Sequence, residues 1–126
     1  MFKVAKREVG DVEPLEYYPS NAALTIGSAA TLGSGGKLSK ASSTVRPSHI
    51  VMGEKNEDGM FPAMKVMPST TFEVQSTATV ADTLIGNKVT LGGDAETVTA
   101  TTTSGVFTVD WTDGATTNST VRGHFA

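Results

Sequence analysis

Few residue combinations in this chain have the spacing that a chemical site requires. The glycine-rich stretch 27–39 contains a Gly-Lys pair of the kind that ends a phosphate-binding loop. Such a loop needs a glycine five residues before the second glycine and a Ser or Thr after the lysine. Thr31 and Leu38 occupy those two positions. The pattern therefore predicts a hairpin between Leu32 and Leu38 in place of a phosphate site.

His49 and His124 are the residues best suited to act as a general base, because the imidazole pKa lies near neutrality. A serine nucleophile on a sharp turn would need a glycine two residues before it, and neither Ser28 nor Ser34 has one. We expect both histidines to be strand residues that bond to water or backbone. A small hydrolase that uses either of them is the least favoured of three hypotheses. We predict no enzyme and no catalytic residue.

The carboxylates do not have the spacing of a metal site. Asp110 and Asp113 precede a glycine, and Asp94 lies close to Glu96, but neither pair matches a calcium-binding loop. The chain contains no cysteine, so thiolate ligands and thiol nucleophiles are excluded as well. We predict no metal, no cofactor, and carboxylates that serve solvated turns.

Trp111 is the single tryptophan of the chain. It alternates with Phe107 and Val109, which predicts a place in the core or in an interface for its ring. The alternative is a platform on which a sugar ring stacks, with Tyr17 or Tyr18 as a second aromatic surface. A carbohydrate-binding β-sandwich module, displayed on a virion or not, is therefore our second hypothesis.

Composition restricts the class of protein. The chain has 126 residues, which suits one domain, and its aromatic share of 6% predicts a thin core that partners complete. A net charge of −3 without a basic cluster argues against nucleic-acid binding. The first residues are charged throughout, and no apolar run is long enough for a signal peptide or a membrane span. We expect a protein made in a cytoplasm, with no membrane partner.

Short alternating runs of apolar and polar residues predict strands. Threonine crowds the second half of the chain and favours a pleated, half-buried surface. Clusters of Gly, Asn and Asp separate the runs and supply tight turns. This pattern predicts an all-β fold, a small antiparallel β-barrel or sandwich. One helical turn is expected near residues 68–69 or 80–82.

Residues 1–20 mix charges and prolines without a regular period. They suit either a frayed terminus or an extended N-terminal arm that orders on a partner, and we favour the arm. The β-rich body then spans 21–126, and its division into lobes 21–78 and 79–126 stays open. The arm would bind through its apolar side chains, which are Phe2, Val4, Val9, Leu15, Tyr17 and Tyr18.

The stretch 22–55, AALTIGSAATLGSGGKLSKASSTVRPSHIVMGEK, combines a strand, a small-residue turn, a Gly-Lys-Leu return and a proline before an apolar strand. It resembles the capsid decoration (cement, head-stabilising) proteins of tailed bacteriophages, the β-tulip group that includes the lambda head decoration protein. The stretches MFPAMKVMPSTTFEV and GVFTVDWTDGATTNSTVRGHFA are similar to such small virion proteins too. The chain departs from a single-lobe member of the group from about Thr79, where a Thr-rich unit begins.

The resemblance implies a structural protein without catalytic residues, located on the capsid surface of the virion. Such a protein binds the outside of the shell formed by the major capsid protein and bridges neighbouring capsomers, often as a homotrimer. Residues 2–20 would be the arm that reaches onto the capsid. Trp111 would be a further interface aromatic.

Overall fold

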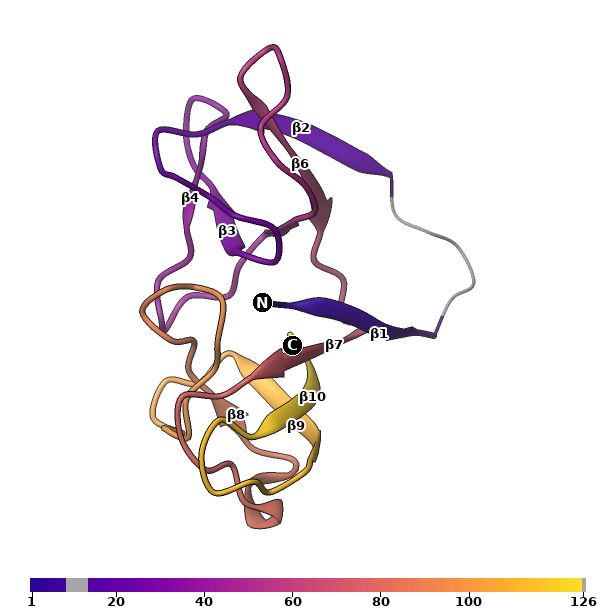
Figure 1. The fold of residues 1–126 in the computed structure, drawn as a ribbon, viewed down its shortest axis with the longest axis vertical. Coiled ribbons are helices and arrows are strands. Elements are labelled where there is room, and N and C mark those ends of the chain that lie inside the picture. Colours follow the sequence, from indigo (N-terminus) through magenta and orange to yellow (C-terminus); the bar gives the residue numbers. More distant parts are fainter. Residues whose placement is uncertain (9–13, 126) are drawn as a thin grey trace.

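The structure is a computed structural model that describes residues 1–8 and 14–125. Ten strands form two antiparallel five-stranded sheets, so the predicted all-β class is confirmed (Figure 1). The described residues contain no α-helix and one 3₁₀ turn, η1 (Asp82–Leu84), which overlaps the expected helical turn at 80–82. No helix in the described part of the chain is long and apolar enough to cross a membrane.

Each sheet is open, because the first and last strands of its order do not pair with each other. Sheet A, the lower sheet in Figure 1, contains in order β1 (Lys3–Arg7), β7 (Thr70–Gln75), β10 (Thr120–Phe125), β9 (Phe107–Thr112) and β8 (Lys88–Val89). Sheet B, the upper sheet, contains in order β2 (Leu15–Pro19), β6 (Met60–Lys65), β5 (His49–Val51), β3 (Ala29–Leu32) and β4 (Leu38–Lys40). The fold is therefore of the sandwich type, and neither sheet closes into a barrel.

The predicted hairpin between Leu32 and Leu38 is confirmed. These two residues are paired at the end of β3 and β4, and the Gly33 amide donates to the Lys37 carbonyl over 2.9 Å. Gly35 and Gly36, at the tip, have φ angles of 82° and 74°. Only glycine adopts that left-handed region readily, so the turn depends on the glycine content of this stretch.

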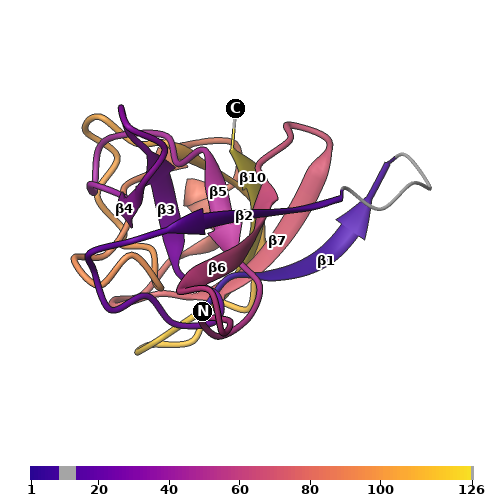
Figure 2. The same cartoon turned by 90° about the horizontal axis from the view of Figure 1, so that it is seen from above.

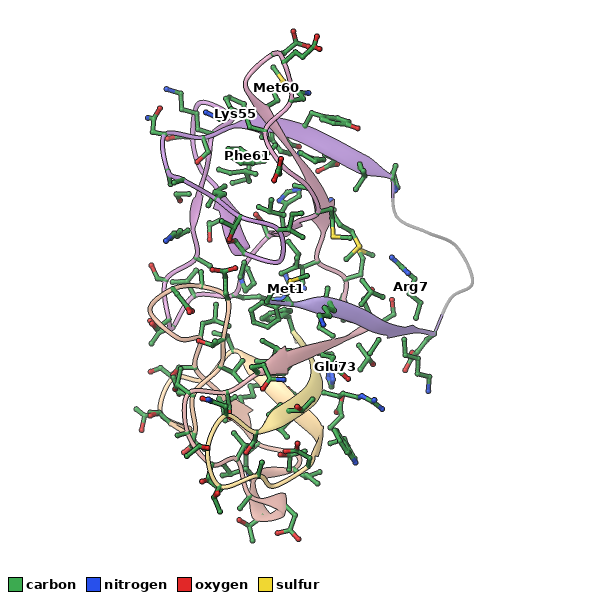
Figure 3. The ribbon with its side chains drawn as sticks, in the orientation of Figure 1. Met1, Arg7, Lys55, Met60, Phe61 and Glu73 are labelled. Atoms are coloured by element: carbon green, nitrogen blue, oxygen red, sulfur yellow. The ribbon has the colours of Figure 1, made fainter. Side chains whose placement is uncertain are left out.

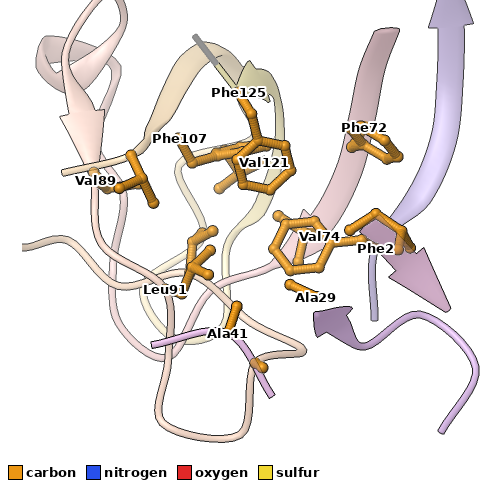
Figure 4. Packing of buried hydrophobic residues seen from close by; sticks show 14 of the residues in the cluster. Phe2, Ala29, Ala41, Phe72, Val74, Val89, Leu91, Phe107, Val121 and Phe125 are labelled. Atoms are coloured by element: carbon orange, nitrogen blue, oxygen red, sulfur yellow. The ribbon is translucent and has the colours of Figure 1, made fainter. Parts of the chain in front are cut away.

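Sheet A has one buried face and one exposed face, as alternation predicts for an antiparallel sheet. Its inward side chains form the main core together with residues from sheet B (Figure 4). Four phenylalanine rings lie at its centre with centroids 5.0–6.4 Å apart, and these are Phe2, Phe72, Phe107 and Phe125. The core is thus built around a larger aromatic cluster than the composition suggested, because Phe2 belongs to it.

The inner strands of sheet B bury side chains on both faces. Ala29, Ile50 and Met64 pack into the main core. Ala30, Val51 and Ala63 point the other way, into a second cluster of buried residues that also contains Leu24. Burial on both sides explains why residues 49–51 are buried in succession instead of alternating.

Residues 1–20 do not extend away from the body where the structure describes them, which corrects the expected arm. β1 pairs with β7 at the edge of sheet A, and β2 pairs with β6 at the edge of sheet B. Phe2 is 2% exposed, and its amide donates to the Gly27 carbonyl over 3.0 Å. An edge strand carries charges on its solvent side, so it lacks the alternation of an inner strand and reads as irregular sequence.

The possible division into lobes at 78/79, which the sequence left open, does not coincide with the division of the strands into sheets. β7 belongs with the later strands in sheet A, so the change of sheet falls between Lys65 and Thr70. The main core contains residues of both sheets. The described chain is therefore one packed unit, with β1 and β2 reaching toward the same side of it (Figure 2).

Candidate interaction surfaces

A β-bulge turns Trp111 onto the outer face of sheet A. Arg122 pairs with Trp111 and the next residue, Gly123, pairs with Val109, so Asp110 is an extra residue in β9. An extra residue reverses the alternation beyond it. Trp111 is 42% exposed as a result, and its predicted place in the core is wrong. Its role in an interface stays a prediction.

Gly123 is the residue that lets the two strands approach at this bulge. A Cβ atom at Gly123 would lie 2.0 Å from the Thr108 carbonyl oxygen and 2.7 Å from the Phe107 ring. No side chain fits at those distances, so the local packing requires glycine.

Three side-chain interactions hold the groups around the indole. The Arg122 guanidinium lies 4.8 Å from the centroid of the Trp111 ring, within the range of a cation–π contact. Its Nε donates to Glu73 Oε1 over 3.1 Å. His124 Nδ1 and Asp110 Oδ2 are 2.8 Å apart. We call these five residues the Trp111 face.

The Trp111 face borders a hollow of about 380 Å³ on the outside of sheet A. Its lining is polar apart from the indole and one proline, and consists of Lys6, Glu8, Pro68, Ser69, Thr71, Asp110, Trp111, Arg122 and His124. Side chains from β1, β7, β9 and β10 line the hollow. These strands are neighbours in the sheet, although β1 and β7 lie far from β9 and β10 in the sequence.

A second surface is apolar and lies on β2. Leu15 and Tyr17 are 45% and 51% exposed on one side of this edge strand. Tyr17 pairs with Pro62 of β6. The Pro62 carbonyl accepts a hydrogen bond from the amide of Met52, whose side chain is also exposed. We call Leu15, Tyr17, Met52 and Pro62 the β2 patch.

A partly buried network of hydrogen bonds fastens β2 to sheet B from the opposite side. His49 is 3% exposed, and its Nε2 donates to Glu16 Oε1 over 2.6 Å, while Nδ1 pairs with Ser48 Oγ at 2.8 Å. The Tyr18 hydroxyl donates to the same Glu16 oxygen over 3.0 Å. These hydrogen bonds, first that from His49 and then that from Tyr18, hold the pKa of the Glu16 carboxyl below its usual value. The Glu16 carboxylate in turn raises the pKa of Tyr18.

Ser48, His49 and Glu16 are linked in the order of a Ser-His-acid triad. Ser48 Oγ accepts the Leu32 amide over 2.8 Å, and both nitrogens of the buried His49 ring have protein partners. The ring nitrogens are used in the opposite sense to those of a serine-protease triad, because Nδ1 meets Ser48 and Nε2 meets Glu16. The network is best explained as the attachment of β2 to β5 and β3.

The residues predicted for the arm separate into three groups. Phe2 is in the core and Val4 packs half-buried against it, so neither is an anchor for a partner. Tyr18 packs half-buried on the second cluster. Leu15 and Tyr17 remain exposed, and Val9 lies outside the described residues.

The remaining predicted groups lie apart from one another. Asp94 and Asp113 each accept backbone amides within their own turns, as predicted for turn carboxylates. Trp111 lies in sheet A and the two tyrosines in sheet B, so the expected joint aromatic platform does not form. Within the described residues no three metal-ligating side chains gather.

A second hollow, of about 540 Å³, lies at the far end of sheet B between residues 22–26 and Glu54-Lys55. Phe61 forms part of its wall, with Lys55 Nζ 5.8 Å from the ring centroid (Figure 3). It is lined mostly by apolar groups. No sequence pattern indicated this hollow, because its two walls meet through the fold alone.

No protein-family model matches this chain, and no curated protein is significantly similar to it in sequence. Neither comparison indicates a function.

Proposed function

We propose that the chain is a phage capsid decoration protein, which binds the outer surface of the major capsid protein shell and stabilises the head by bridging capsomers. The observation that carries the proposal is the β2 patch, where Leu15 and Tyr17 are exposed on an edge strand. The resemblance of residues 22–55 to decoration proteins supports the same function.

The two edge strands near the N-terminus differ in a way that favours a partner on β2. β1 presents Lys3 and Lys6 to solvent, and such charges prevent further strands from pairing with an edge. β2 presents Leu15 and Tyr17 instead. A free edge with exposed apolar side chains can add a strand or a flat surface of another protein, with backbone hydrogen bonds and side-chain contacts together.

The β2 patch is small, and a capsid compensates for a small contact by repetition. A decorated shell offers the same site many times in fixed symmetry, so copies that touch each other as well as the shell bind with high avidity. A homotrimer on the capsid surface belongs to this proposal. It places the protein on the virion exterior, without nucleic acid or membrane as a partner.

Co-sedimentation tests the proposal. Purified protein is mixed with expanded, undecorated capsids of its cognate major capsid protein, and the pellet is quantified. We expect saturable binding, with affinity reduced at least about tenfold in a Leu15→Ser/Tyr17→Ser variant, a loss of about 1.4 kcal/mol. The matched control is Trp111→Ala, an exposed aromatic on the other sheet, which should bind as the parent does. Folded protein that stays in the supernatant would refute the proposal.

A further inference from the structure

We propose that the Trp111 face is a binding site for a neutral oligosaccharide built of β-linked hexopyranose units. The site is on sheet A and the β2 patch is on sheet B. The proposal therefore stands independently of capsid binding, and the two can be tested separately.

The indole provides the platform for stacking. Trp111 is exposed because the bulge in β9 turns it outward, away from the core that Val109 enters. The axial C–H groups of a β-linked pyranose form a flat apolar face, and their partial positive charge is attracted to the electron-rich face of an aromatic ring. An indole on a sheet surface is wide enough to accept one such ring.

The platform is held in place before a ligand arrives. Arg122 lies 4.8 Å from the ring centroid on one side, and Glu73 fixes Arg122 through a 3.1 Å hydrogen bond. Both partners are on strands next to each other in the sheet, so Arg122 is held on one side of the ring. A preordered side chain loses less entropy on binding, which increases affinity without adding a contact.

Polar groups around the indole match the hydroxyls of a sugar. The side chains of Arg122, Glu73, His124 and Asp110 are 50%, 31%, 31% and 42% exposed, so each keeps polar atoms open to water. Carboxylates accept from hydroxyl groups, whereas guanidinium and imidazole N–H groups donate to them. An aromatic surface with a few fixed polar groups beside a hollow is the general form of a small-ligand site.

The charges favour a neutral saccharide over the other occupants. Around the hollow, cations and carboxylates balance, with Lys6 and Arg122 against Glu8 and Asp110. A site without an excess of cations does not attract a polyanionic glycan. A protein partner is disfavoured too, because the centre of a protein interface is poor in charged residues and this ring is surrounded by them.

Fluorescence titration tests the site, since the chain has one tryptophan. The probes are cellohexaose and chitohexaose, with maltohexaose as an α-linked neutral sugar and oligogalacturonate as an anionic one. We expect a saturable change in Trp111 emission with a β-linked probe and a Kd of about 1 mM or tighter. The α-linked and anionic probes should bind at least about tenfold more weakly.

Variants locate the site by calorimetry or ligand-observed NMR, which do not need the indole. Trp111→Ala should abolish binding, Trp111→Phe should restore part of it, and Tyr17→Ala should leave it unchanged. Far-UV circular dichroism confirms that each variant is folded. The proposal is overturned by an unchanged emission with both β-linked probes, by equal binding in Trp111→Ala, or by preference for the anionic probe.

Discussion

At the scale of single residues, two positions decide much of this structure, and neither is conspicuous in the sequence. Gly123 permits the bulge that exposes Trp111, because any Cβ there would meet the Thr108 carbonyl at 2.0 Å. Phe2 enters the centre of the aromatic core although it is the second residue of the chain. Gly123 acts on the neighbouring strand, 15 residues before it, whereas Phe2 contacts Phe107 and Phe125, more than one hundred residues away.

Gly123→Ala should destabilise the protein by about 1–3 kcal/mol, the usual cost of forcing an extra group into a packed interior. Urea denaturation measures this change. Gly93→Ala is the matched control, because a Cβ at Gly93 meets nothing within 4 Å and its backbone is not left-handed. The control should differ from the parent by less than about 0.5 kcal/mol. If the two variants were equally stable, a Cβ at residue 123 would not clash with Thr108 and Phe107.

Phe2→Ala should cost about 3–5 kcal/mol, because the ring contacts Phe72, Phe107 and Phe125 in a fully buried cluster. Tyr17→Ala, which removes an exposed ring from the same N-terminal region, should change stability by less than about 0.5 kcal/mol. Thermal unfolding compares the two variants. A Phe2→Ala protein as stable as the parent would indicate that the N-terminal segment is the free arm that the sequence predicted.

At the scale of elements, the attachment of β2 depends on one ionised carboxylate. Glu16 accepts hydrogen bonds from His49 and Tyr18, and these lower its pKa in the folded protein. The lowered pKa means that Glu16 stabilises the fold above its ordinary pKa of 4.5, and that this contribution disappears as pH falls through the folded value. Acid should therefore loosen β2 before it unfolds the rest of the chain.

Hydrogen exchange of the β2 amides measures this effect. We expect exchange in β2 to accelerate several-fold relative to β6 as pH falls from 5 toward 3, after correction for the intrinsic rate. Glu16→Gln keeps the size of the side chain but not its charge, so it should show fast β2 exchange already at pH 7 and little further change in acid. A Glu16→Gln protein with the parent's pH dependence would contradict the role of this carboxylate.

Some of these elements could be predicted from the sequence and others could not, for physical reasons. The hairpin at 32–38 is local, and its glycines specify the turn. The bulge in β9 was not predictable, because it depends on register with β10 and on the close contact at Gly123. Leu15 and Tyr17 were predicted to bind a partner as part of an arm, but Met52 and Pro62 join them only through strand pairing. Alternation identified strand positions but not the partner strands.

At the scale of the whole molecule, the two sheets form a single cooperative unit. Residues of both sheets fill the main core, and β1 and β2 connect the N-terminal region to one sheet each. Trp111 reports on sheet A by fluorescence, and far-UV circular dichroism reports on both sheets. Their urea transitions should coincide within error, as two-state unfolding requires. Two separated transitions would indicate independent lobes.

Deletion of residues 1–20 also tests whether the two sheets share one core. The deletion removes β1 and β2, one edge strand of each sheet, together with Phe2. The remaining protein should be largely unfolded or aggregated at 25 °C, because this loss exceeds the typical free energy of unfolding of a small domain. Circular dichroism and size-exclusion chromatography measure this outcome. A soluble body with the parent's thermal stability would contradict the shared core.

We propose that this molecule covers a capsid shell and contacts it through the β2 patch. A cryo-electron microscopy map of capsids decorated with the protein would locate this contact. We predict one copy of the two-sheet body at each of a set of symmetric positions, with Leu15 and Tyr17 buried against the major capsid protein and Trp111 facing outward. Shells without added density, or density in which Tyr17 faces solvent, would contradict it.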